Sequence, residues 1–138
     1  MYGRTIPAVT AATELRKVMV WPVAVIDGQA SLAEVAEALA ADEVGALCVT
    51  EEGRLAGIVS ERDVVTHLGT GADPTHLTAA EVMSNDLVSA APGDSVLEAG
   101  RRMADAQVRH LPVLEAGEIA GIVSMRDLFT ILLGEARD

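Results

Sequence analysis

The chain has 138 residues, half of them apolar, and a formal net charge of −11 at pH 7. This length allows one domain or two small units. With only ten Lys and Arg, the chain lacks the basic surface that nucleic acids and anionic membranes require. Its apolar runs are far shorter than the ~18 residues that a membrane span needs, and no signal-peptide pattern opens the chain. We therefore expect a cytoplasmic protein that binds neither nucleic acid nor membrane.

Along the chain, residues 1–14 lack clear periodicity and are expected to form an N-terminal arm. Residues 15–68 are expected to form a first repeat, residues 69–77 a linker that contains Gly69, Gly71 and Pro74, and residues 78–138 a second repeat. A repeat of roughly 50 residues would bury too little apolar surface to be stable alone, so we expect the two to share a core.

Each repeat contains the same predicted elements in the same order. A short apolar extended stretch is followed by an amphipathic helix with a capping box, a hairpin with a Gly-containing turn, and a last helix. The equivalent positions are the stretches 23–26 and 87–90, the helix starts Ser31-x-x-Glu34 and Ser95-x-x-Glu98, and the turn residues Gly53 and Gly117. Thr78-x-x-Glu81 predicts a further short helix. The sequence therefore predicts an α+β fold of two tandem β-α-β-β-α units related by pseudo-twofold symmetry.

The clearest sign of duplication is the heptapeptide Gly-Ile-Val-Ser-x-Arg-Asp, which occurs at residues 57–63 and 121–127. Six of its seven residues are identical, and the offset of 64 positions continues outside it, for example from Met19 to Met83. A repeat at a fixed offset indicates a duplicated structural unit. The duplication places two identical sets of polar side chains in one molecule.

The heptapeptide has a structural interpretation. Ser60-x-x-Asp63 and its equivalent fit the start of a helix, and Gly57 and Gly121 would relax the turn that enters the last strand. This interpretation leaves Arg62 unexplained, because the helix dipole disfavours a cation in the first turn.

The functional interpretation uses all the polar groups. Ser60 and Ser124 would stand at helix N-termini, which bind anions through free N–H groups. The adjacent arginines, Arg62 and Arg126, add affinity for phosphate, and a carboxylate suits the two hydroxyls of a ribose. Apolar strand residues beside them could sandwich a purine base. The heptapeptide therefore suits a nucleotide.

The paired heptapeptides, the β-α-β-β-α order and Arg109-His110-Leu111-Pro112-Val113 resemble a tandem pair of CBS domains, the cystathionine β-synthase repeats that form a Bateman module. The resemblance extends from about residue 15 to 133 and is closest to small stand-alone bacterial members. It implies that Asp63 and Asp127 hold ribose hydroxyls. It further implies that the serines contact ribose or phosphate and that both motif arginines face phosphates. Basic residues that open the middle strand of a repeat often bind phosphate in this family, which adds Arg109 and His110.

The first repeat departs from this pattern. It has Gly45-Ala46 where the second has Arg109-His110, and Cys48 where the second has Pro112. We therefore expect two clefts of unequal affinity, with the cleft that holds Arg109 better suited to a phosphorylated ligand. Cys48 lies in an apolar run and is expected to be a buried hydrophobe rather than a reactive thiol.

No metal-ligand spacing, nucleophile elbow, P-loop or Rossmann fingerprint is present, so we expect neither a metal site nor catalysis. The predicted function is a regulatory module that binds AMP or ADP. ATP, which would need Mg²⁺, S-adenosylmethionine and NAD(H) stay open as ligands, and no cofactor is required. The apolar final helix of each repeat, at 128–133 and around 64–68, predicts a homodimer. The alternative is a dimerising adaptor of the same fold without ligand; in either case the effector protein is not readable from the sequence.

Overall fold

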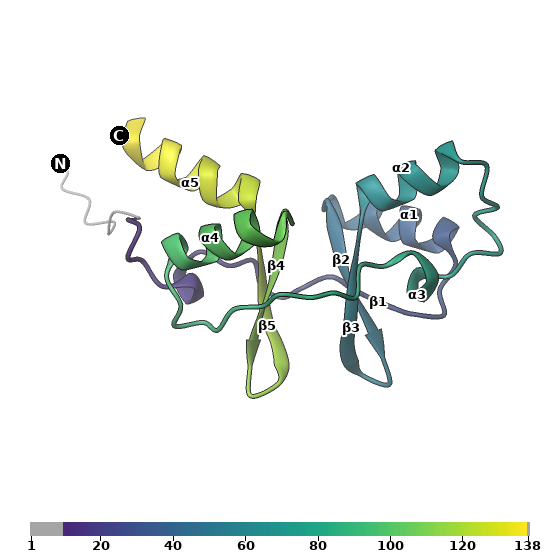
Figure 1. The fold of residues 1–138 in the computed structure, drawn as a ribbon, viewed down its shortest axis with the longest axis horizontal. Helices are drawn as coiled ribbons and strands as arrows, with labels where there is room; N and C mark the ends of the chain where they lie inside the picture. The colour runs from purple at the N-terminus through teal and green to yellow at the C-terminus, as the bar shows by residue number, and fades with distance from the viewer. Residues whose placement is uncertain (1–9, 138) are drawn as a thin grey trace.

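A computed structural model of the protein describes residues 10–137, so residues 1–9 of the predicted arm lie outside the described residues. Its elements follow the predicted repeat (Figure 1). The first repeat comprises β1 (Val25–Asp27), α1 (Leu32–Asp42), β2 (Ala46–Glu51), β3 (Arg54–Ser60) and α2 (Glu61–Gly69). The second comprises α4 (Val96–Ala106), β4 (His110–Glu115), β5 (Glu118–Ser124) and α5 (Met125–Arg137). The first repeat opens with a short 3-10 helix, η1 (Leu15–Lys17), and the second opens with the short helix α3 (Ala79–Val82).

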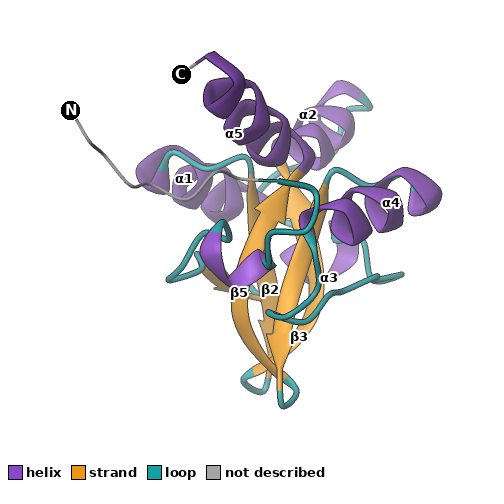
Figure 2. Cartoon of the chain, turned by 90° about the vertical axis from the view of Figure 1, so that its left-hand side faces the viewer, coloured by secondary structure: helices purple, strands orange, loops and turns teal. Residues whose placement is uncertain are grey.

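The strands of both repeats run through the middle of the molecule. Figure 2 shows the helices α1, α2, α4 and α5 around one end of the strands and the hairpin turns at the other. Both hairpins turn through two residues of left-handed backbone, with φ of 53° and 78° at Glu52-Gly53 and 52° and 82° at Ala116-Gly117. Positive φ at both central positions is typical of the type I′ turn, whose twist matches that of the strands. The predicted tight hairpins are confirmed.

The first helix of each repeat begins at the predicted serine. Ser31 forms a complete capping box with Glu34, at 3.1 Å from its Oγ to the Glu34 N–H and 2.8 Å from its N–H to the carboxylate. Ser95 accepts from the Glu98 N–H at 3.1 Å, but the Glu98 carboxylate accepts from Arg102 at 3.3 Å instead of from Ser95. Only half of the second predicted capping box therefore forms, because a charged donor lies one turn along the same helix.

The extended stretch that opens each repeat is held differently in the two repeats. Residues 25–27 form β1, which pairs in parallel with β2 at three positions. The equivalent stretch of the second repeat pairs with β4 at one position, Ala90 with Val113, so the predicted strand at 87–90 is reduced to a bridge. Cys48 donates its N–H to the Ala24 carbonyl at 3.1 Å. Its equivalent, Pro112, has no N–H to donate.

The apolar core is divided into two main clusters, one centred on each repeat. Each cluster also contains residues of the other copy, Leu15 in the second and Ala79 and Val82 in the first, so the two copies share their core as expected, although not as one continuous cluster. The first repeat packs Leu32, Val35, Leu47, Val49 and Val59 between its helices and sheet. The second packs the equivalent Val96, Ala99, Leu111, Val113 and Val123. The repeats meet through a third, smaller cluster of Ala46, Cys48 and Ile58 with Leu87, Ile119 and Ile122 beside it.

The segment that leads into each repeat packs on the other repeat. Leu15 of η1 is fully buried in the core of the second repeat, and Val20 exchanges two backbone hydrogen bonds with Ile122 at 2.9 and 3.1 Å. In the same way, Val82 of α3 is buried in the core of the first repeat, and Ser84 pairs with Ile58. These crossed segments tie the two repeats together.

The heptapeptide glycines lie where the crossed segments pass over the strands, and not in a turn. Gly57 lies within β3, where a Cβ would stand 2.5 Å from Met83 Sδ and 2.8 Å from the Ser84 carbonyl oxygen. Gly121 lies within β5, where a Cβ would stand 2.6 Å from Met19 Sδ. The prediction that these glycines relax the turn before the last strand was wrong. Because they have no side chain, Met83 and Met19 of the crossed segments can pack directly against the strands.

Candidate functional site

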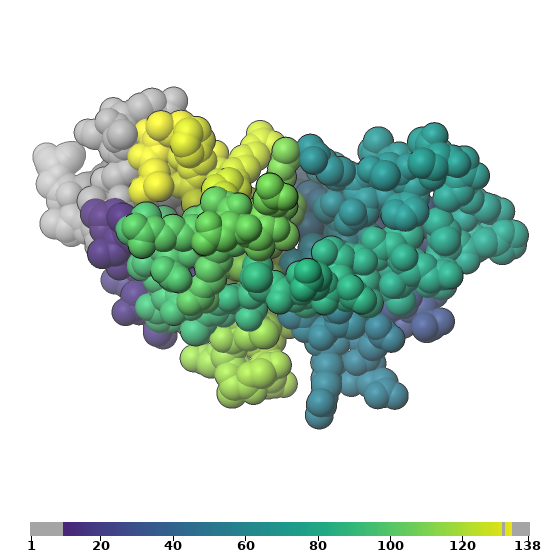
Figure 3. All heavy atoms as spheres, in the orientation of Figure 1, coloured from purple at the N-terminus to yellow at the C-terminus, as the bar shows by residue number. Residues whose placement is uncertain are grey.

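A cleft with a volume of about 1590 Å³ lies between the two repeats. Figure 3 shows the repeats as two lobes that meet along a furrow in the middle of the molecule. All eight polar residues selected from the sequence line this cleft: Ser60, Arg62, Asp63, Arg109, His110, Ser124, Arg126 and Asp127. The fold thus brings together side chains from the N-termini of α2 and α5 and from the start of β4.

Within the first heptapeptide, the serine and the aspartate bind each other. Asp63 Oδ2 accepts from the Ser60 N–H at 2.8 Å and from the Ser60 hydroxyl at 3.1 Å, and the Asp63 N–H donates back to Oγ at 3.2 Å. This is a complete capping box. Part of the hydrogen-bonding capacity of the Asp63 carboxylate is therefore used by the helix start.

The second heptapeptide is capped on one side only. Ser124 Oγ accepts from the Asp127 N–H at 2.9 Å. Among the described residues, the Asp127 carboxylate accepts no hydrogen bond, although it is half-buried at the cleft. Asp127 consequently offers both carboxylate oxygens to a ligand, whereas Asp63 would have to share one with its own helix cap.

The arginines selected from the sequence lie at the rim. The side chains of Arg62, Arg109 and Arg126 are exposed to solvent and line the cleft, and none forms an ion pair with another described residue. Unpaired guanidinium groups at a cleft are available for charge-assisted hydrogen bonds to phosphate oxygens.

His110 extends from the second repeat toward the first. A Cβ on Gly45 would stand 3.8 Å from His110 Nε2 and 3.3 Å from Glu61 Oε1. The imidazole and this carboxylate therefore both face the space that Gly45 leaves open. The contrast between Gly45-Ala46 and Arg109-His110, noticed in the sequence, has a steric meaning: small residues in one repeat make room for a large one from the other.

The surroundings of His110 mix burial with charges from both repeats. Burial lowers the pKa of His110, and the nearby Arg109 lowers it further, while the carboxylates of Asp127, Asp63 and Glu61 act in the opposite direction; the net shift is downward. Aspartates from both heptapeptides thus act on a single imidazole. The electrostatic environment of His110 therefore depends on both halves of the cleft.

Cys48 is fully buried at the contact between the repeats. Burial raises the pKa of its thiol from 9.0 to about 11, which disfavours the reactive thiolate. The expectation of a buried hydrophobe is confirmed.

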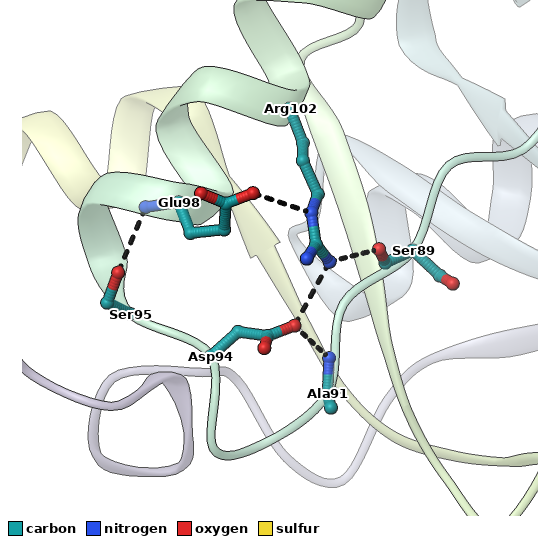
Figure 4. Close-up of polar contacts among 6 residues, drawn as sticks. All are labelled: Ser89, Ala91, Asp94, Ser95, Glu98 and Arg102. Carbon is teal, nitrogen blue, oxygen red and sulfur yellow. Dashed lines mark hydrogen bonds and ion pairs between the residues drawn. The ribbon is translucent and has the colours of Figure 1, made fainter.

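The cleft also has apolar walls, which the sequence indicated only in general terms. They consist of Val23, Ala24 and Ile58 from the first repeat and Leu87, Val88 and Ile122 from the second. Behind the second wall, Arg102 donates three hydrogen bonds (Figure 4). Its Nη1 donates to the Ser89 carbonyl at 2.9 Å and to Asp94 Oδ2 at 3.0 Å, and its Nε donates to Glu98 Oε1 at 3.3 Å. The sequence interpretation missed Arg102, although the fixed offset sets it against Ala38 and could have singled it out.

Comparison with known proteins identifies the family. The family model for the CBS domain matches twice, at residues 15–70 and 79–134. The chain is 31% identical over 116 residues to the CBS domain-containing protein YhcV of Bacillus subtilis, covering 84% of this chain and 83% of that protein. It is 35% identical over 108 residues to an uncharacterized 33.4 kDa protein of Thermofilum pendens, covering 78% of this chain but only 35% of that protein.

Solved structures agree with this assignment at the level of the fold. The CBS domain pair of protein MJ0100, solved with 5′-methylthioadenosine and S-adenosyl-L-methionine, superposes with a TM-score of 0.82 at 21% identity, covering 90% of this chain and 98% of that chain. A CBS domain of a membrane protein from Sphaerobacter thermophilus gives 0.76 at 26% identity, covering 88% and 89%. The chain belongs to the CBS domain family and folds as a CBS domain pair.

No helix within residues 10–137 is long and apolar enough to cross a membrane. In the same range, no three or more His, Cys, Asp and Glu side chains are grouped so that they could hold a metal ion.

Proposed function

We propose that this CBS domain pair is a non-catalytic regulatory module that binds an adenosine nucleotide, AMP or ADP, in the cleft between the repeats. The observation that carries the proposal is the convergence of all eight selected polar residues on one cleft. Asp127 would hold the ribose hydroxyls, Ser124 and the arginines would hold phosphate, and the apolar walls would contact the base. The neighbour solved with two adenosine compounds has the same fold and supports this ligand class.

The net charge of −11 repels an anionic nucleotide at long range, so the affinity has to come from local contacts. Each charge-assisted hydrogen bond to an arginine contributes roughly 1.5–3 kcal/mol. The three exposed arginines can supply such contacts to a mono- or diphosphate, and His110 can add a hydrogen bond. A triphosphate carries more charge and would need Mg²⁺ to screen it.

A thermal-shift screen of AMP, ADP, ATP, S-adenosylmethionine and NADH tests the proposal. A ligand at 100 times its dissociation constant stabilises the folded protein by about 2.7 kcal/mol. Asp127→Ala should abolish the shift, or Asp63→Ala if the other half of the cleft is the occupied one. Asp105→Ala is the matched control, because Asp105 is an exposed aspartate of α4 that does not line the cleft. If none of the five compounds raises the melting temperature, the module is a ligand-free adaptor instead.

We further propose that the module is a homodimer through α2 and α5. The outer faces of these helices expose Val65, Leu68, Phe129 and Leu133, with Val65 and Phe129 at 68% and 65%. Val65 and Phe129 occupy equivalent positions in the two repeats, so both repeats would present an apolar side chain to a partner copy. Light scattering at micromolar concentration should give twice the mass of the chain. Val65→Asp should give the monomer, and Leu97→Asp, at an exposed site on α4, should not.

A further inference from the structure

The two walls of the cleft are attached to the sheet by different means. In the first repeat, the Ala24 carbonyl accepts from the Cys48 N–H at 3.1 Å, directly in front of the paired strand β1. In the second repeat, the equivalent acceptor is the carbonyl of Val88 and the equivalent donor position is Pro112, which has no N–H. One strand hydrogen bond of this wall is therefore missing.

A side chain of α4 holds the second wall from its other side. Arg102 Nη1 donates to the Ser89 carbonyl at 2.9 Å and to Asp94 Oδ2 at 3.0 Å. The same oxygen of Asp94 accepts from the Ala91 N–H at 2.8 Å (Figure 4). Residues 89–91, which directly follow Leu87 and Val88 of the wall, are thus linked to the helix through one guanidinium.

The first repeat has no such link. The residues equivalent to Arg102 and Asp94 are Ala38 and Ala30, and neither side chain has a polar atom. The second repeat keeps two strand bonds at Ala90, from its N–H to the Pro112 carbonyl at 3.0 Å and from the Leu114 N–H to its carbonyl at 2.8 Å. The arginine clamp is therefore found in the repeat that lacks the further bond from position 112.

We propose that Arg102 is a positioning residue of the nucleotide cleft: it replaces the hydrogen bond that Pro112 removes and so fixes the wall 87–91 against which the ligand binds. The proposal rests on nucleotide binding as proposed above. Arg102 does not line the cleft, so it acts through Leu87 and Val88, which do. Its side chain is 36% exposed, which leaves the clamp partly shielded from solvent.

The test replaces Arg102 by methionine, which keeps the length of the side chain and removes its donors. Arg102→Met should bind AMP about tenfold more weakly in titration calorimetry, since the wall loses a charge-assisted link. Arg101→Met is the matched control: it makes the same charge change on the same helix at an exposed side chain. The amide protons of Ala90 and Ala91 should exchange faster in Arg102→Met without any nucleotide present.

A rescue separates positioning from a general loss of stability. Pro112→Ala restores an N–H opposite Val88 without adding a thiol, and in the Arg102→Met background it should recover both AMP affinity and amide protection. In the wild-type background the same change should add little, because Arg102 already holds the wall. Equal affinity and exchange in Arg102→Met and Arg101→Met, or no recovery with Pro112→Ala, would overturn the proposal.

The two proposals fail in different ways. If the wild type binds no AMP, the proposed nucleotide function fails, and the effect of Arg102 on the ligand fails with it. Amide exchange at Ala90 and Ala91 requires no nucleotide, so it decides independently whether Arg102 and Pro112 compensate each other in holding the wall.

Discussion

The first repeat uses its polar groups to stabilise its own fold, whereas the second leaves more of them facing the cleft. In the first repeat, Asp63 closes a capping box with two hydrogen bonds from Ser60. In the second, the carboxylate of Asp127 accepts no hydrogen bond from any described residue. Two copies of one motif thus differ in how much of it remains available to a ligand.

The same contrast holds for charge. The second repeat supplies Arg109 and His110 to the cleft, where the first has Gly45 and Ala46. The two repeats therefore share one fold but present different side chains to the cleft, because single substitutions changed the residues at equivalent positions.

The largest difference in stability should come from the heptapeptide glycines. Gly57→Ala places a methyl group 2.8 Å from the backbone oxygen of Ser84, which cannot move without breaking its pairing with Ile58. The three atoms nearest to the new methyl group of Gly121→Ala are Met19 Sδ, Cγ and Cβ, at 2.6, 2.8 and 3.1 Å, and a rotamer change can move the two closest of them. We expect about 3 kcal/mol of destabilisation for Gly57→Ala and about 1 kcal/mol for Gly121→Ala.

Urea unfolding of both variants measures this difference. Gly53→Ala is not a suitable control, because its φ of 78° strains any side chain. Gly100→Ala serves better, since a Cβ there meets no atom within 4 Å and alanine favours the helix α4. Equal costs at Gly57 and Gly121 would mean that the two crossed segments are equally adaptable.

The next difference should come from the motif aspartates. Asp63→Ala removes two hydrogen bonds from the start of α2 and should cost about 1–2 kcal/mol. Asp127→Ala removes only a favourable charge near the helix N-terminus, worth about 0.5 kcal/mol. Urea unfolding without ligand measures both. A cost for Asp127→Ala as large as that for Asp63→Ala would show that the Asp127 carboxylate is also tied to its helix, against the contrast drawn above.

Much of this arrangement was predictable from the sequence. The fixed offset and the Ser-x-x-acid pattern predicted the repeat order, the hairpins and the helix starts, because capping and turn formation depend on residues close in the chain. The eight polar residues of the cleft followed from the heptapeptide and from Arg109-His110. Whether these residues bind a nucleotide stays a prediction.

The features that were missed depend on contacts between distant segments. That η1 packs on the second repeat, and that Gly57 makes room for Met83, follow from the crossing of the chain and not from local pattern. The loss of the predicted strand at 87–90 was in principle readable, because Pro112 lacks an N–H, but its compensation by Arg102 required the geometry.

The smallest effect should come from His110, the group that both motif aspartates act on. Its pKa lies below the ordinary value of 6.5, with burial as the first cause. The unfolded chain therefore binds more protons than the folded chain as the pH falls through 6.5. Above pH 6.5, His110 is neutral in both states and does not reduce the free energy of unfolding. Between pH 6.5 and the lower pKa of the folded state, the free energy of unfolding falls as the pH falls. His110→Gln should reduce the slope of melting temperature against pH in this range.

A phosphorylated ligand should reverse the preference of His110 for its neutral form. A phosphate beside the imidazole favours the charged state, so binding takes up a proton and AMP affinity should be about threefold higher at pH 6 than at pH 7.5. Calorimetry in two buffers of different ionisation enthalpy measures the proton uptake directly. His110→Gln should remove it, and His76→Gln, on the exposed linker, should not. A wild type that binds AMP with no proton uptake would place the phosphate away from His110, and the contrast between Gly45-Ala46 and Arg109-His110 would then concern Arg109 alone.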